Sequence, residues 1–70
     1  MPLTYAEIGK ACVIQKVGGN PQTRRFLESL GFAPGSTVTV MNAIGGSVIV
    51  NVKDSRVAVS KEMAVKIMIA

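Results

Sequence analysis

The chain has 70 residues, of which 49% are hydrophobic but only 4% aromatic, and its formal net charge is +4. So short a chain is expected to form one domain over residues 1–70, with an aliphatic core and no aromatic platform for stacking bases. One cysteine and no histidine exclude an internal disulfide and the usual tetrahedral zinc site.

The first predicted elements are a lead-in segment and a strand. Residues 1–10 are expected to contain a single turn, TYAEIG, capped by Thr4. The stretch ACVIQKV, Ala11–Val17, is rich in β-branched residues and predicts a strand that ends at Gly18-Gly19. The start of the chain lacks the pattern of a signal peptide, and no apolar run is long enough to span a bilayer. We therefore expect a cytoplasmic protein without direct membrane insertion.

One amphipathic helix is predicted over about residues 20–30. Asn20 is a favourable N-cap, and Pro21 suits the first helical position because its missing N–H would be unpaired there anyway. At about 100° per residue, one helical stripe contains Thr23, Phe26, Leu27 and Leu30. We expect this stripe to face the core, so that the two leucines and the phenylalanine close one end of the sheet.

The sequence LGFAPG, which follows this helix, predicts a sharp stop. Gly31 lies where a left-handed closing residue is needed, and Phe32 lies where a Schellman motif returns an apolar residue onto Leu27. Pro34 prevents the helix from resuming. Pro34-Gly35 should therefore turn the chain into the next strand.

The remainder of the chain predicts four strands and a single helical turn. Two-residue turns are expected at Gly45-Gly46 and Asp54-Ser55, and Ser60 should cap the helical turn KEMA. The predicted strands cover Ser36–Ile44, Ser47–Lys53, Arg56–Val59 and Val65–Ile69, with Val65, Ile67 and Ile69 on one face of the last one. Five short strands favour a small, strongly bent sheet that closes into a barrel, because closure removes exposed edges. The fold class is therefore mainly β, an SH3-like barrel, with an OB-like barrel as the alternative.

The candidate reactive residues do not form a catalytic pattern. The four acidic residues Glu7, Glu28, Asp54 and Glu62 have no motif partner, and there is no histidine to act as a base. Cys12 lies within a strand and lacks a histidine to activate it. The other soft ligands are methionines, which usually fill gaps in aliphatic cores. We expect no enzyme activity, no cofactor and no metal site.

Arg24 and Arg25 form the only adjacent basic pair and lie near the start of the predicted helix, where the helix dipole disfavours positive charge. They could be solvated and paired with Glu28, although such pairs contribute only about 0.2–0.5 kcal/mol and Arg before Glu is the weaker order. They could instead face an acidic partner surface, for which arginine is well suited. Both readings stay open.

The charge and composition of the chain also bear on other macromolecular partners. A basic barrel could bind nucleic acid, but OB-type readers need aromatic residues on the sheet, and this chain has only Tyr5, Phe26 and Phe32. Valine-rich strand edges could also support a weak homo-oligomer. We therefore do not expect nucleic-acid binding, but a small basic nucleic-acid-binding module remains the alternative function.

The run RRFLESLGFAPGSTVTV, which begins at Arg24, resembles the signature of the ferrous iron transport protein A (FeoA) family. The likeness extends to the opening turn Thr4–Gly9, the segment Arg56–Val59 and the closing segment Ala64–Ile69. One departure is the short connection 42–47, where many family members carry a longer loop.

The resemblance implies an SH3-like cytoplasmic domain with an accessory role in bacterial ferrous iron uptake. It implies regulation of the membrane Fe(II) transporter FeoB by protein–protein contact, and transition-metal binding, for which this sequence offers no ligand set. We expect the partner-binding residues to be the outer helix face with the nearby hairpin turn, namely Arg24, Arg25, Glu28, Gly45 and Gly46.

Overall fold

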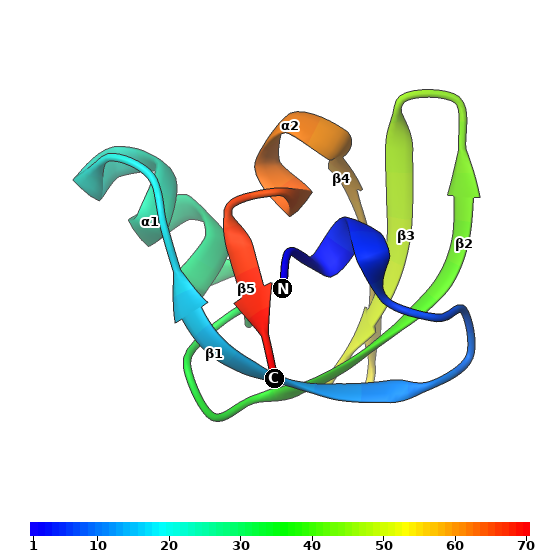
Figure 1. Ribbon diagram of the computed structural model, residues 1–70. Helices are drawn as coiled ribbons and strands as arrows, with labels where there is room; N and C mark the ends of the chain where they lie inside the picture. The colour runs from blue at the N-terminus through cyan, green and yellow to red at the C-terminus, as the bar shows by residue number, and fades with distance from the viewer.

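The computed structural model describes all 70 residues. Its elements are η1 (Leu3–Tyr5), β1 (Ala11–Val17), α1 (Pro21–Ser29), β2 (Thr37–Ile44), β3 (Ser47–Val52), β4 (Ser55–Ser60), α2 (Lys61–Ala64) and β5 (Ile67–Ile69). Figure 1 shows the strands curving around a common interior, with α1 on one side and the β2–β3 hairpin on the other. The expected five strands, the helix between the first two and the helical turn before the last are confirmed.

The strands form one antiparallel sheet in the order β4-β3-β2-β1-β5. β1 joins the two halves of this sheet: its first part, Ala11–Val13, pairs with β2, and its second part, Ile14–Val17, pairs with β5. The register shifts between Val40 and Asn42 in the β2–β3 pair, and again along β1. Such irregularities bend strands, and they let so short a sheet curl around a core.

The core is entirely apolar, and no polar or charged residue is buried. In β3 the pattern SVIVNV buries every second residue, as a strand with one face on the core should. The buried residues are Leu3, Ile14, Val17, Leu27, Phe32, Val38, Val40, Val48, Val50, Val52, Val59, Ala64, Ile67 and Ile69. The core therefore stabilises the fold by aliphatic packing, and every charged group lies at the surface.

The predicted start and stop of α1 are confirmed. The Thr23 N–H donates to Asn20 Oδ1 over 2.8 Å, which makes Asn20 the N-cap. At the other end the Gly31 and Phe32 N–H groups donate to the carbonyls of Glu28 and Leu27, each over 3.0 Å. This pair of bonds is the Schellman motif, and the φ of +105° at Gly31 supplies its left-handed residue.

The expectation that Phe26 belongs to the core is wrong, because its side chain is 49% exposed. The helix is only nine residues long, and it faces inward along the line of Thr23, Leu27 and Leu30. Phe26 is about 100° from Leu27 around the helix axis. With Leu27 and Phe32 fully buried, the interior beneath α1 is already filled, and Phe26 points outward.

Three smaller expectations are also wrong. Val65 is exposed because it ends α2, its N–H bonded to the Lys61 carbonyl, so strand alternation does not reach it. Thr4 caps nothing, because the opening turn is the 3₁₀ segment after Pro2, which has no side-chain cap.

The second hairpin turn is Lys53-Asp54, one residue earlier than expected, with Lys53 in the left-handed region at φ +54°. A non-glycine residue rarely adopts this conformation, so sequence alone does not favour it.

Candidate partner-binding site

The exposed side of α1 carries the predicted charged residues, and one aromatic residue lies at its edge, about 100° around the helix axis from Arg25. We call Arg24, Arg25, Phe26 and Glu28 the α1 face; all four are exposed. None of the side-chain hydrogen bonds in the protein uses either guanidinium group. The two arginines are therefore free of internal hydrogen bonds, which weakens the reading that they serve Glu28.

Phe26 is the residue of this face that sequence reasoning missed. Its place in an apolar stripe predicted a core residue, and nothing in the local pattern distinguishes it from Leu27. An exposed phenylalanine beside two arginines is typical of interaction surfaces, because aromatic residues and arginine are enriched at the centres of interfaces. The α1 face thus combines apolar area with positive charge.

Gly45 and Gly46 lie far from the α1 face, so the expectation that the hairpin turn is near the helix is wrong. A Cβ on Gly31 would lie 2.5 Å from Val52 Cγ1, so the end of α1 packs at the last residue of β3. The hairpin turn is at the other end of β3, five residues or about 17 Å away. Figure 1 shows α1 and the β2–β3 turn on opposite sides of the molecule.

The hairpin turn is instead connected to α2. The Gly46 carbonyl accepts from the Lys61 N–H over 3.0 Å, and Ile44 pairs with Ser47 across the two-residue turn. A Cβ on either glycine would meet nothing within 4 Å, so this tip projects into open space. The five predicted site residues therefore form two separate surfaces.

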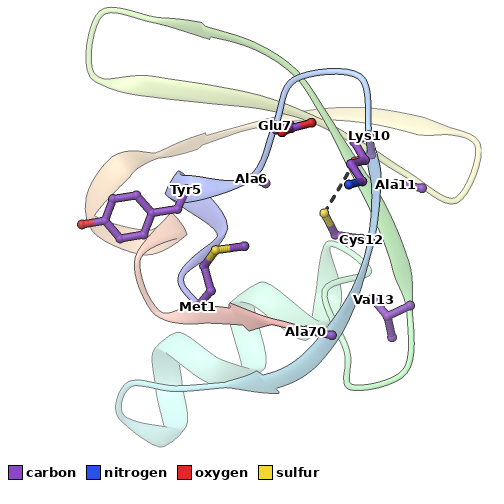
Figure 2. A pocket seen from close by; sticks show the side chains of 9 residues that line it. All are labelled: Met1, Tyr5, Ala6, Glu7, Lys10, Ala11, Cys12, Val13 and Ala70. Atoms are coloured by element: carbon purple, nitrogen blue, oxygen red, sulfur yellow. Dashed lines mark hydrogen bonds between the residues drawn. The ribbon is translucent and has the colours of Figure 1, made fainter.

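A third surface feature is a groove of about 500 Å³ between the start of the chain and the first half of β1. Figure 2 shows its walls: Met1, Tyr5 and Ala6 on one side, and residues 10–13 on the other. The nine lining residues are Met1, Tyr5, Ala6, Glu7, Lys10, Ala11, Cys12, Val13 and Ala70. Cys12 lies half-buried there, and its thiol donates weakly to the Lys10 carbonyl at 3.5 Å. Sequence reasoning placed Cys12 in a strand but gave no sign of the groove.

The donor atoms of this protein do not fit a resident transition metal. No group of three His, Cys, Asp or Glu side chains lies close enough together to hold an ion. Glu7 is the only acidic side chain that lines the same groove as the Cys12 thiol. No helix is long and apolar enough to cross a bilayer.

The family model for the FeoA domain matches residues 1–70. The chain belongs to the FeoA family. It is 31% identical over 68 residues to the "Putative Fe(2+) transport protein A" of Methanocaldococcus jannaschii, a match that covers 97% of this chain and 83% of that protein. A relative that matches almost the whole chain is thus named for Fe(2+) transport.

Two solved structures show the same fold. An iron uptake regulatory protein (FeoA) matches with a TM-score of 0.90 and 27% identity, over 99% of this chain and 93% of that one. FeoA of Stenotrophomonas maltophilia in complex with zinc, described as a procaryotic SH3 domain protein, matches with a TM-score of 0.87 and 24% identity, over 100% and 89% of the two chains. The SH3-like fold expected from the strand pattern is confirmed.

Proposed function

We propose that this protein is a non-enzymatic accessory protein of ferrous iron uptake, which acts in the cytoplasm by binding the cytosolic region of the membrane transporter FeoB. The observation that carries the proposal is the match of the FeoA domain over the whole chain. The surface supports a binding role, because every charged side chain is exposed and can meet a partner.

We place the main contact on the α1 face. The two arginines have no internal hydrogen-bond partner, so they can meet carboxylates of a partner without first losing an interaction. Phe26 adds exposed apolar area about 100° around the helix axis from Arg25, and aromatic residues contribute strongly to binding. The tip at Gly45 and Gly46 is a second, separate predicted contact, which a partner reaches only by extending around the sheet.

The test is a binding titration of the purified protein with the cytosolic region of the transporter. We expect the double variant Arg24→Glu/Arg25→Glu to bind at least about tenfold more weakly, a loss of about 1.4 kcal/mol. The matched control is Lys53→Glu/Arg56→Glu at the β3–β4 turn. Each pair of reversals changes the net charge by −4, from +4 to 0, so the control measures the general effect of charge.

Two results would contradict this proposal at different levels. Equal weakening by both double variants would show that net charge matters and the α1 face does not. Absence of any complex with the transporter, in the presence or absence of guanine nucleotide, would remove the proposed function itself.

A further inference from the structure

β4 forms one edge of the sheet, and one side of this strand has backbone groups without a partner. Just beyond β4 the Lys61 N–H donates to the Gly46 carbonyl over 3.0 Å, on the side where β3 runs. Because backbone groups alternate in direction along a strand, Arg56, Ala58 and Ser60 direct theirs to the opposite side. No strand lies on that side, and no backbone hydrogen bond outside the sheet uses Arg56 or Ala58. We call these three residues the β4 edge.

The β4 edge lacks most of the features that keep edge strands from pairing. β3 and β4 pair in register over six residue pairs without a bulge, and β4 contains no proline. All three residues of the β4 edge are exposed. A regular, uncovered edge strand is a template for pairing with another strand. The opposite edge strand of the sheet, β5, is only three residues long and offers much less.

The β4 edge of a second copy fits this edge in one register. Identical strands related by a two-fold axis pair antiparallel. All three edge residues find a partner only when Ala58 lies opposite Ala58 of the second copy, which places Arg56 opposite Ser60. Any other register places an edge residue opposite the β3–β4 turn or α2 of the second copy. The β4 edge is therefore self-complementary.

The side chains that meet in this register suit a close approach. Ala58 lies on the two-fold axis, where its methyl group leaves room for the two backbones. On the inner face the half-buried Val57 lies opposite Val59 of the second copy, and cross-strand pairs of β-branched residues stabilise a sheet. Arg56 is the only charged residue in β4, and it lies opposite Ser60, so it does not meet a second arginine.

The charges beyond the two ends of β4 do not oppose this pairing. Lys53 and Asp54 lie beyond the turn end, and Lys61 and Glu62 lie beyond the helix end. In an antiparallel pair the turn end of one copy meets the helix end of the other. Each junction thus brings together two cations and two anions, although each chain has a net charge of +4. The long-range repulsion between two copies is therefore not concentrated at this edge.

We propose that two copies of this protein associate through their β4 edges and form one continuous sheet across a two-fold axis at Ala58. Backbone hydrogen bonds between the edge residues hold the pair, and Val57 packs against Val59 of the second copy. One strand from each copy makes a small interface, below about 1,200 Å² in total, so the dimer is weak. None of these residues belongs to the α1 face or to the hairpin tip, so the proposal is independent of the contact with the transporter.

The first test is disulfide formation between copies, in protein whose native thiol is removed by Cys12→Ser. Adding Ala58→Cys places two thiols opposite each other, at a Cα–Cα distance of about 5.5 Å that a disulfide can span. The matched control adds Arg56→Cys, which lies on the same edge but about 13 Å along the strands from its counterpart in the second copy. Under mild oxidation we expect the Ala58→Cys protein to form the covalent dimer at least about tenfold faster, because pairing raises the effective concentration of the second thiol.

A second pair of variants tests association without oxidation. Ala58→Glu places two like charges directly opposite each other, which disfavours pairing. Ala43→Glu makes the same charge change at an exposed position of β2 and is the control. In sedimentation experiments at rising concentration, the apparent mass of the wild type and of the control should rise from 7.4 kDa toward twice that value. The mass of the Ala58→Glu variant should stay at that of one chain.

Three outcomes would overturn the proposal. Equal rates of covalent dimer formation in the two thiol variants, or equal association of the two glutamate variants, would exclude the β4 edge as the interface. A wild-type mass of one chain at every concentration would exclude the dimer. Protection of the Ala58 amide from hydrogen exchange only when the transporter's cytosolic region is added would identify a segment of that protein as the occupant in place of a second copy.

Discussion

The segment Asn20–Gly35, which contains α1 and its stop, and the tip of the β2–β3 hairpin both depend on glycine turns, yet they are attached to the fold differently. At the stop, Gly31 packs against Val52 and Phe32 is fully buried. At the tip, both glycines face open space and Ile44 is 62% exposed. A substitution in the first region should therefore cost more stability than the same kind of substitution at the tip, where no packing is lost.

The largest expected difference concerns an apolar side chain in each region. Phe32→Ala should lower the free energy of unfolding by about 3–5 kcal/mol, because it leaves a cavity in a core of only 14 residues. A domain of this size has little stability in reserve, so the variant should be largely unfolded at room temperature. Ile44→Ala should cost less than about 1 kcal/mol, since its side chain is already mostly in water. Denaturant titration of both variants measures this, and similar losses would contradict the comparison.

The two phenylalanines also show how far sequence reasoning reaches in this fold. The sequence predicts the position of Phe32 because Gly31 before it and Pro34 after it fix the local geometry of the stop. The sequence does not predict the exposure of Phe26, because a nine-residue helix has no clear boundary to its apolar stripe. Only the packing of Leu27 decides which edge of the stripe faces inward.

The candidate site likewise has parts that local sequence signals predict and parts that only tertiary contacts determine. The charged residues of the α1 face could be found from sequence, since charge at a helix start is a local signal. The separation of this face from the hairpin tip depends on which end of β3 meets the helix, which is a tertiary contact. The groove depends on a tertiary contact as well, because its walls come from the start of the chain and from β1.

The next comparison is between the two glycines. Gly31→Ala should cost about 3 kcal/mol, because the residue needs a left-handed conformation and its Cβ would overlap Val52. Gly45 has a φ of +58°, within the left-handed helical region, so Gly45→Ala should cost about 1–2 kcal/mol, without any overlap. Thermal unfolding of the two variants measures how much more stability is lost at the crowded Gly31 position than at the open Gly45 position. Equal losses would mean that the core strand β3 shifts easily to admit a methyl group, and that the stop of α1 is less rigid than its packing indicates.

The smallest expected difference is at the start of α1. Asn20→Ala removes the acceptor for the Thr23 N–H and should cost about 1 kcal/mol. Asn20→Asp keeps an acceptor and adds a favourable negative charge at the helix start, so it should be neutral or slightly stabilising.

Asn42 offers the counterpart near the hairpin tip, where its Oδ1 accepts only from the adjacent Ala43 N–H. Asn42→Ala should therefore change stability by less than about 0.5 kcal/mol. A loss at Asn42 equal to that at Asn20 would show that the tip is held as firmly as the helix. In that case its glycines could not be treated as a contact surface independent of folding.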